Sequence, residues 1–212
     1  MAERIGLRET KRRRTREAIS EAAIALFAAE GYDRVPVARI AAAAQISKPT
    51  LFAYFPSKED LVLHRIADHE DESARVVRAR PDGTAPMAAL RTHYLGALDR
   101  RDPATGLNDS PEVLEYQRLL YGTPALAARL PAYLSRGEKA LAEALAEAGA
   151  PPGPARTAAA QVTAVQRVLG EDTSARMLAG EAADAVAPDA RRRAEDAFDL
   201  LEGGLSGLFT GG

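Results

Sequence analysis

Residues 35–60 read VPVARIAAAAQISKPTLFAYFPSKED, and this stretch decides the fold of the chain. It predicts two short helices joined by a tight turn. On the first helix the bulky Ile40 precedes the small Ala41, which lets another helix cross closely. Leu51 and Tyr54 lie on the inner face of the second helix. This spacing is typical of a helix-turn-helix, whose second helix lies in the major groove of DNA.

The outer face of the second predicted helix suits contact with base edges. It carries short or basic side chains, namely Lys48, Pro49, Thr50 and Ala53. Ser47 just before it is a natural N-cap, because its side-chain oxygen can accept a backbone N–H that has no partner within the helix. We therefore expect this face to read DNA.

A second cap follows directly. Phe55-Pro56 ends the helix, and Ser57 with Asp60 three residues later forms a capping box that starts the next helix. Lys58 is thereby placed at a helix N-terminus. There its ammonium and the unpaired backbone N–H groups are expected to grip one phosphate together.

The positive charge of the chain gathers near this stretch. The 212 residues carry a net charge of −2, but residues 1–58 hold eleven Lys and Arg against six Asp and Glu. This region is therefore +5 and the remainder −7. A basic head on an acidic body is typical of a phosphate-binding module joined to a second function, although a random scatter of charge stays open.

Residues 11–16, KRRRTR, are the most basic part of this region. Beside a helix-turn-helix, such a run predicts an arm in which Lys11, Arg12 and Arg14 reach phosphates or the minor groove. The alternative is a solvated face without DNA contact.

Composition argues against several other classes. The chain has no cysteine, which excludes disulfides and thiolate metal sites. The start MAERIGLRETKRRR lacks the apolar core of a secretory signal, and no run of about 18 apolar residues predicts a spanning helix. We expect a soluble, cytoplasmic protein with no membrane partner.

An Ala-rich composition with few aromatic residues predicts an all-α fold. We expect a three-helix head at residues 1–57 and a larger ligand-binding and dimerisation body at residues 58–212, with about nine helices. The first helix should span 9–30, and a long connector should run from Leu61 to about Arg80. Prolines and glycines predict further helices at 86–100, from 111, from 124 with a kink or restart at Pro131, at 138–148, at 155–178 and at 188–208.

Several separate motifs of the head resemble one family. They are LFAAEGY at 26–32, RIAAAAQIS at 39–47, KPTLFAYF at 48–55 and SKEDL at 57–61. Together they resemble the DNA-binding head of the TetR family of bacterial repressors. The resemblance implies a homodimer on a palindromic double-stranded operator. It also implies which positions meet DNA, namely Lys48, Thr50, Phe52, Ala53, Tyr54 and Lys58.

The chain departs from the family pattern at two positions. Family members usually have Gly in the turn where this chain has Gln45, which must either adopt a left-handed conformation at about 1 kcal/mol or change the turn. They commonly have Tyr where this chain has Phe52, which is expected only to pack near the sugar–phosphate surface, with Tyr54 as a hydroxyl donor. The full predicted DNA-contacting set is Lys11, Arg12, Arg14, Arg39, Gln45, Ser47, Lys48, Pro49, Thr50, Phe52, Ala53, Tyr54 and Lys58.

The resemblance also implies an effector cavity in the body, between the connector helix and the helices after it. Its predicted lining is Ile66, Leu90, His93, Tyr94, Leu98, Tyr116, Leu120, Tyr133, Val162 and Gln166. These residues are mostly apolar with a few phenolic hydroxyls, which suits a hydrophobic small molecule with one or two polar groups. A cationic or neutral ligand and a fatty-acyl ligand both stay open. Each residue, His93 included, has a plain core position as its alternative.

Apolar stripes at three- and four-residue steps mark the last two helices. With the resemblance they predict a four-helix dimer seam containing Val165, Leu169, Phe198, Leu201 and Leu205. A core within one chain is the alternative for either stripe.

No phosphate-binding glycine loop, metal-spaced histidine pair or nucleophile elbow occurs, so no enzyme activity, cofactor or metal is predicted. The sequence predicts a dimeric, sequence-specific DNA-binding transcriptional regulator, a repressor that a small hydrophobic ligand releases from its operator. One alternative is a DNA-binding regulator with no small-molecule effector, gated by a protein partner or by abundance. Another is an enzyme that retains a vestigial head.

Overall fold

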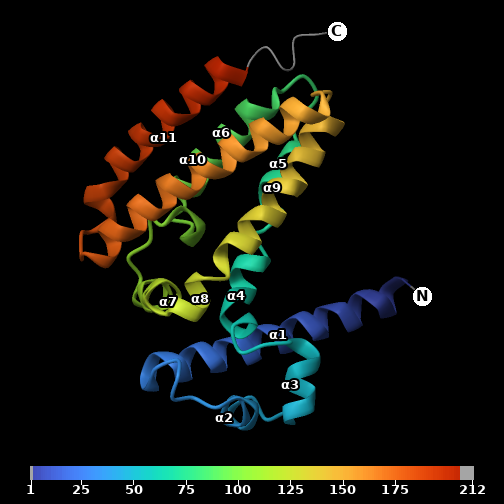
Figure 1. Ribbon diagram of the computed structural model, residues 1–212, viewed down its shortest axis with the longest axis vertical. Helices are drawn as coiled ribbons and strands as arrows, with labels where there is room; N and C mark the ends of the chain where they lie inside the picture. Colours follow the sequence, from blue (N-terminus) through green and yellow to red (C-terminus); the bar gives the residue numbers. More distant parts are fainter. Residues whose placement is uncertain (1, 206–212) are drawn as a thin grey trace. The chain divides into compact units, whose positions relative to one another are not determined.

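Every regular secondary-structure element of the described chain is a helix (Figure 1). The computed structural model describes the backbone of residues 2–205 and the side chains of residues 10–204. The elements are α1 (Ala2–Glu30), α2 (Val37–Ala43), α3 (Lys48–Tyr54), α4 (Asp60–Ala67), α5 (Glu72–Arg78), α6 (Pro86–Asp99), the 3-10 turn η1 (Pro103–Thr105), α7 (Pro111–Gly122), α8 (Pro124–Ala127), α9 (Leu130–Glu147), α10 (Pro152–Leu178) and α11 (Ala183–Leu205). The predicted all-α class is confirmed. Over the described residues, no helix is both long enough and apolar enough to cross a membrane.

Backbone contacts group the chain into two compact units. The first unit comprises Met1–Ala67 with Glu115–Ala128, and the second comprises Asp68–Leu114 with Arg129–Gly212. Helices α4 and α8 and most of α7 therefore group with α1–α3. The predicted functional boundary at residue 57 stays a prediction.

One face of α1 builds the core of the first unit. Ile19, Ala23 and Phe27 recur every four residues, so they share one side of the helix, and each is at most 1% exposed. Helix α1 contacts both α2 and α4, whose Ile40 and Leu61 are fully buried. Each large buried side chain contributes roughly 1.5–3 kcal/mol. This face therefore holds the helix-turn-helix against α1.

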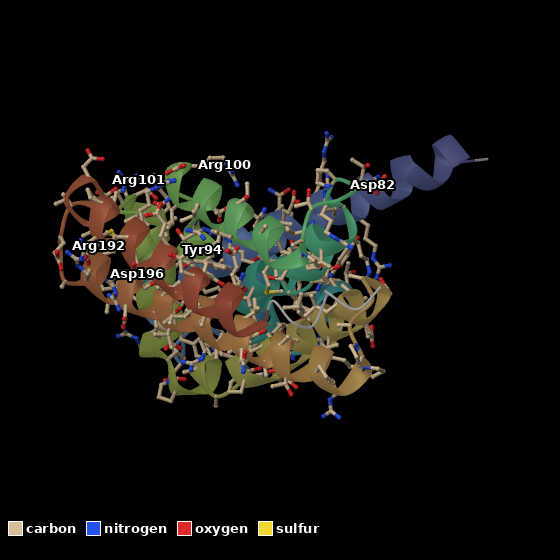
Figure 2. All side chains as sticks on the ribbon, turned by 90° about the horizontal axis from the view of Figure 1, so that it is seen from above. Asp82, Tyr94, Arg100, Arg101, Arg192 and Asp196 are labelled. Carbon is tan, nitrogen blue, oxygen red and sulfur yellow. The ribbon has the colours of Figure 1, made fainter. Side chains whose placement is uncertain are left out.

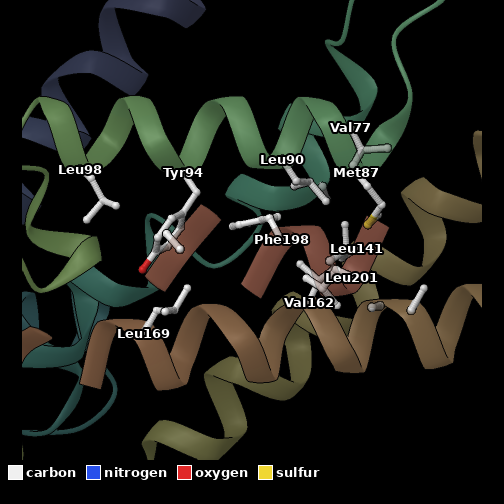
Figure 3. Packing of buried hydrophobic residues seen from close by; sticks show 14 of the residues in the cluster. Val77, Met87, Leu90, Tyr94, Leu98, Leu141, Val162, Leu169, Phe198 and Leu201 are labelled. Atoms are coloured by element: carbon white, nitrogen blue, oxygen red, sulfur yellow. The ribbon is translucent and has the colours of Figure 1, made fainter. Parts of the chain in front are cut away.

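The second unit has one large apolar core, to which α5, α6, α9, α10 and α11 all contribute. Figure 3 shows Leu90 and Tyr94 of α6 beside Phe198 of α11, with Val162 of α10 in the same cluster. The rings of Tyr94 and Phe198 lie 5.7 Å apart in a tilted arrangement. Interlocked side chains of this kind hold α6, α10 and α11 together.

The connector helix predicted from Leu61 to Arg80 is interrupted, and that prediction is wrong. Helix α4 ends before residue 68 and α5 begins at Glu72. In the turn between them, the Glu72 N–H donates to the His69 carbonyl at 3.1 Å.

Contacts with α9 explain the interruption. Glu70 in this turn accepts two hydrogen bonds from the Arg136 guanidinium, at 2.8 and 2.7 Å. Its carbonyl also approaches Gly137 so closely that a Cβ there would come within 2.5 Å of the oxygen. The turn is therefore stabilised by a helix more than sixty residues away, which the local apolar period does not reveal.

Other helix limits differ from the predicted ones mainly at prolines. Helix α10 begins at Pro152 because a proline in the first turn lacks only an N–H that the helix does not use. Helix α11 begins at Ala183 and contains Pro188. Pro131 lies in the first turn of α9, so the predicted restart there is confirmed.

Candidate nucleic-acid interface

The turn between α2 and α3 is a left-handed helix C-terminus. Gln45 has a φ of +54°. Its N–H donates to the Ala42 carbonyl at 3.1 Å, and the Ile46 N–H donates to the Ala41 carbonyl at 2.9 Å. These two bonds define a Schellman motif, which usually has glycine at the left-handed position. Of the two outcomes expected for Gln45, the left-handed one is observed.

The N-cap predicted at Ser47 is present. Ser47 Oγ accepts the backbone N–H of Thr50 at 3.1 Å and lies 2.7 Å from Thr50 Oγ1, so the two hydroxyls share a hydrogen bond. Pro49 occupies the first turn of α3, where no donor is needed. Ser47, which caps the start of α3, is therefore also hydrogen-bonded to Thr50, the side chain that is the candidate for reading a base.

Helix α3 has a buried face and an exposed face. Leu51 and Phe55, the latter just after the helix, are fully buried. Lys48, Thr50 and Ala53 are exposed, as is Pro49. The sequence placed these side chains on opposite faces, and the structure agrees.

Phe52 is a large apolar side chain on the exposed side of α3. It is 40% exposed, and the Lys48 ammonium lies 5.9 Å from its ring centre. Tyr54 is half-buried. A ring with a cation above it can pack against a sugar while the charge meets a phosphate, so packing by Phe52 near the DNA surface stays a prediction.

The basic run at residues 11–16 lies on α1, within the first helix predicted over residues 9–30, so the predicted arm is helical. Lys, Arg and Glu are good helix formers, and the Arg13–Glu17 pair at 3.5 Å supports the helix. Lys11, Arg12 and Arg14 are exposed along it. Their contact with DNA stays a prediction, now from a helical surface.

Two cations predicted to bind phosphate already have partners within the first unit. Arg39 Nη1 donates to Glu30 Oε2 at 2.5 Å. Lys58 Nζ donates to the Tyr32 carbonyl at 2.5 Å and lies 5.2 and 4.4 Å from the ring centres of Phe27 and Tyr32. Burial lowers the pKa of Lys58 from its usual value. Lys58 thus ties the start of α4 to the end of α1, and its phosphate contact stays a prediction.

The capping box before α4 is confirmed. The Ser57 N–H donates to Asp60 Oδ2 at 3.0 Å, and the Asp60 N–H donates to Ser57 Oγ at 3.3 Å. This reciprocal pair encloses Lys58 and Glu59 and so helps to hold Lys58 in the position just described.

The predicted effector-lining residues divide between the two units. Ile66, Tyr116 and Leu120 belong to the first. Tyr116 donates its hydroxyl to the Val62 carbonyl of α4 at 3.0 Å, and Leu120 is buried. These contacts are internal to the first unit.

The remaining candidates lie in the second unit, and most have structural contacts there. Leu90 and Val162 are fully buried in its core. Gln166 accepts a hydrogen bond from Ser73 at 3.2 Å. Tyr133 is buried with a guanidinium 4.3 Å from its ring centre. Leu90 and Val162 therefore have plain core positions, and contact of any of these side chains with an effector stays a prediction.

Tyr94 and Leu98 do line a cavity. Its other walls are Leu169, Thr173, Arg176, Asp189, Ala190 and Arg193. The volume is about 10 Å³, which is room for one water molecule. The Tyr94 hydroxyl is buried without a hydrogen-bond partner, and burial raises the pKa of this phenol well above its usual value. A drug-sized ligand needs about 300 Å³ or more, so this cavity would have to open.

Glu72 at the start of α5 bridges two histidines. His69 Nδ1 lies 2.9 Å from one carboxylate oxygen, and His93 Nε2 lies 3.0 Å from the other. The hydrogen bonds from His69 and then His93 hold the pKa of Glu72 well below its usual range. The bond to Glu72 in turn raises the pKa of His69. His93, predicted as an effector contact, instead joins α6 to α5.

The predicted dimer residues lie mostly inside the second unit. Leu169, Phe198 and Leu201 are 8%, 0% and 6% exposed, and Val165 packs half-buried against the same core. The side chain of Leu205 lies outside the described residues. Leu169, Phe198 and Leu201 therefore pack within one chain, as the alternative interpretation has it, and contact of Val165 with a second copy stays a prediction.

The exposed apolar side chains of these helices are the neighbours of the predicted ones. Val168 of α10 is 44% exposed and Leu200 of α11 is 80% exposed. Each stands one position before a buried leucine, so the apolar arc is wider than one core-facing stripe. That extra width was the signal in the sequence for a second apolar surface.

Comparison with known proteins agrees with the helix-turn-helix. The profile of the family described as bacterial regulatory proteins, tetR family, matches residues 19–64. The HTH-type transcriptional regulator TcmR of Streptomyces glaucescens is 34% identical over 135 residues, 63% of this chain and 58% of TcmR. The HTH-type transcriptional repressor LfrR of Mycolicibacterium smegmatis is 33% identical over 154 residues, 68% of this chain and 73% of LfrR.

Solved structures share the fold. GusR of Salmonella enterica aligns with a TM-score of 0.56 at 24% identity, covering 91% of this chain and 95% of GusR. NalD of Pseudomonas aeruginosa aligns with a TM-score of 0.56 at 18% identity, covering 87% of this chain and 97% of NalD.

Fold and site together define a helical regulator with a DNA-binding helix-turn-helix head. The chain belongs to the TetR family of bacterial regulatory proteins, which are transcription regulators and not enzymes. It spans 58% of the length of TcmR and 31% of that of the Bacillus subtilis regulator YuxN.

Proposed function

We propose that this chain is a homodimeric repressor that binds a palindromic operator through α3. The observation that carries the proposal is the exposed face of α3, where Lys48, Thr50 and Ala53 are accessible while Leu51 is fully buried. Short and basic side chains on such a helix fit the major groove, where each base pair presents a distinct pattern of donors and acceptors. Two relatives in fold or sequence, NalD and LfrR, are described as repressors.

Different residues have different tasks in this proposal. Thr50 meets a base edge, and Lys48 meets a base or a nearby phosphate. The exposed cations Lys11, Arg12 and Arg14 of α1 neutralise phosphates without reading sequence. Binding should therefore weaken as salt rises, because each neutralised phosphate releases counterions.

The dimer is proposed to form through the exposed surfaces of α10 and α11. Val168 and Leu200 supply apolar area there, and Ala164, one turn before Val168, lets another helix approach closely. On α11, Arg192 and Asp196 are four residues apart and both exposed (Figure 2). About a two-fold axis, Arg192 of one copy could face Asp196 of the other, and each such contact would occur twice. The two α3 helices would then lie about 34–36 Å apart, in successive major grooves.

Release from DNA is proposed to follow binding of a small hydrophobic molecule in the second unit. A structure of the fold neighbour SmeT is described as a complex with triclosan. In this chain the cavity beside Tyr94 holds about 10 Å³, so a ligand would enter only as the surrounding helices repack. That small volume favours the second candidate function, a regulator with no small-molecule effector that is gated by a protein partner or by abundance.

Selection from a random DNA pool with the full-length protein tests the DNA proposal. A palindromic sequence should be enriched. Thr50→Ala should relax the preference at one base pair of each half-site by roughly 1–3 kcal/mol. Arg12→Ala should weaken binding to specific and random DNA alike and reduce the salt slope by about one. Equal losses on both kinds of DNA for both variants would contradict the role of Thr50, and no enrichment would contradict the whole proposal.

Sedimentation of charge-insertion variants tests the dimer. Leu200→Glu should sediment as a monomer, because a carboxylate would have to be buried in the interface. Leu134→Glu is the matched control, since Leu134 of α9 is 37% exposed and lies outside the proposed surface. Loss of the dimer in the Leu134 variant only, or in neither, would refute the assignment of the interface.

A panel of hydrophobic compounds tests release. Compounds that raise the melting temperature and also free the selected operator in an anisotropy assay would support an effector. Stable operator binding in the presence of every compound would favour the second candidate.

A further inference from the structure

We propose that Ser47 is a positioning residue for base recognition, because its hydroxyl determines what Thr50 offers to DNA. The inference rests on the proposed function and adds to it the chemical class of base that Thr50 reads. It places a specificity role at the N-cap of α3, whose ordinary task is only to start the helix.

The geometry joins the cap and the reading side chain in one hydrogen-bonded chain. The Thr50 N–H donates to Ser47 Oγ at 3.1 Å, and Ser47 Oγ lies 2.7 Å from Thr50 Oγ1. Both residues are exposed, whereas Leu51 next to Thr50 is fully buried. A threonine in a helix divides between two rotamers, depending on what its hydroxyl can bond. Here the partner is Ser47, so the bond selects the rotamer of Thr50.

Counting donors and acceptors determines what remains available. A serine hydroxyl has one proton and two lone pairs. One lone pair of Ser47 accepts the Thr50 N–H, and an oxygen that accepts a hydrogen bond becomes a better donor. Either hydroxyl could donate in the 2.7 Å bond between them, and because the accepted N–H makes Ser47 the better donor, the shared proton is assigned to Ser47, which donates to Thr50 Oγ1. Of the two hydroxyl protons in the Ser47–Thr50 pair, the Thr50 proton is then the one that remains to donate to DNA.

A donor on Thr50 selects a base that presents an acceptor. In the major groove these acceptors are guanine O6 and N7, adenine N7 and thymine O4, whereas cytosine presents an amino donor. Thr50 should thus disfavour cytosine at the base it meets. If Ser47 could only accept, Thr50 would donate to Ser47 and would offer DNA only its lone pairs, which suit the amino groups of cytosine and adenine.

Ser47→Asp separates this role from capping. Aspartate caps a helix about as well as serine, yet as a carboxylate it has no proton to donate. Ser47→Ala removes both functions, and Ser47→Thr keeps both. Ser57→Ala is the matched control, because Ser57 also caps a helix in the first unit but has Asp60 as its partner.

The experiment measures affinity of the full-length protein for four versions of the selected operator. The four operators differ only at one base pair. This base pair is first located as the one at which Thr50→Val, which keeps the shape of threonine but lacks its hydroxyl, loses the preference of the unaltered protein. Circular dichroism first establishes that each variant is folded. Affinity ratios among the four operators are compared, because the charge of aspartate should weaken binding to all of them alike.

The expected result is a change of preference. Ser47→Asp should move the ratio at that base by about 5-fold or more, away from guanine and thymine, which present only acceptors, and towards cytosine, which presents only an amino donor. Ser47→Thr and Ser57→Ala should keep the original ratio. In the Thr50→Val background, Ser47→Asp should no longer change it, since the two residues act through one bond.

Two results would overturn the inference. If Ser47→Asp and Ser47→Ala weaken all four operators equally, Ser47 is a cap only, and the proposed function stands without this addition. If the unaltered protein selects no sequence at all, the proposed function falls and the inference falls with it.

Discussion

Replacing Gln45 by glycine should stabilise the helix-turn-helix. Gln45 has a φ of +54°, a conformation that costs a residue with a side chain about 1–2 kcal/mol. Glycine removes that strain but gives the unfolded chain more freedom, which costs about 0.4–1 kcal/mol. The difference leaves a gain of about 0.5 kcal/mol. Because the Gln45 side chain is exposed, little packing is lost with it.

Ala44→Gly is the matched control for this prediction. Ala44 precedes Gln45 at the end of α2 and has a φ of −80°, where alanine is unstrained. Glycine there only adds freedom to the unfolded chain and should destabilise by roughly 0.5–1 kcal/mol. The two glycine variants should therefore change the free energy of unfolding in opposite directions, and their values should differ from one another by about 1–1.5 kcal/mol.

Amide hydrogen exchange can measure both effects locally. The Ile46 N–H is bonded to the Ala41 carbonyl across this turn, so its exchange reports the free energy of opening. Exchange at Ile46 should slow in Gln45→Gly and accelerate in Ala44→Gly. If Gln45→Gly accelerated exchange as much as Ala44→Gly does, the left-handed strain assigned to Gln45 would be refuted.

Three further substitutions probe other contacts. Gly106→Ala should destabilise the second unit by about 3 kcal/mol or more in urea unfolding, because a Cβ at its φ of +76° would lie 2.4 Å from the Gly170 carbonyl oxygen; an unchanged midpoint would contradict this packing. His69→Gln should abolish a pH-dependent stability term. Because the pKa of His69 is raised in the folded protein, the stabilisation from its bond to Glu72 is fully present below pH about 6.5 and is lost as the pH rises through the pKa of the folded state. Because the pKa of Glu72 is lowered, the same stabilisation is lost on acidification only below pH about 4.5. The protein should therefore lose roughly 0.5–1 kcal/mol between pH 6 and 8 that the variant does not lose, and parallel pH profiles would refute the bridge. Lys58→Met should lower the stability of the first unit by about 1 kcal/mol in thermal unfolding without DNA, because it removes an ammonium bonded to a carbonyl; unchanged stability with weakened DNA binding would favour the phosphate role instead.

The head was largely predictable because its determinants are local. The cap at Ser47, the buried Leu51 and the box from Ser57 to Asp60 each follow from residue type and spacing within a few positions. The left-handed turn at Gln45 was also expected as one of two outcomes, because a Schellman turn constrains φ at one position whatever residue occupies it.

Side-chain partners distant in the sequence were not predictable in this way. Lys58 was expected at a phosphate, but its ammonium lies between the Tyr32 carbonyl and two aromatic rings at the end of α1. His93 was expected near an effector, but it bonds Glu72 across from α5. A long charged or polar side chain has many possible partners, and only the packing of the helices selects one.

The sequence by itself determined that this chain is helical and that residues 35–60 form a helix-turn-helix with an exposed, partly basic face. These properties follow from short-range periodicity and capping, which act through neighbouring residues. Only the tertiary structure decided that the predicted connector helix is interrupted near Glu70, which contacts Arg136 and Gly137 of α9. It also decided which apolar side chains of each helix are buried in the core of the chain: Phe198 is buried, and Leu200 is exposed. An apolar period marks a face to be covered, but the covering surface is set by helices that meet from distant parts of the chain.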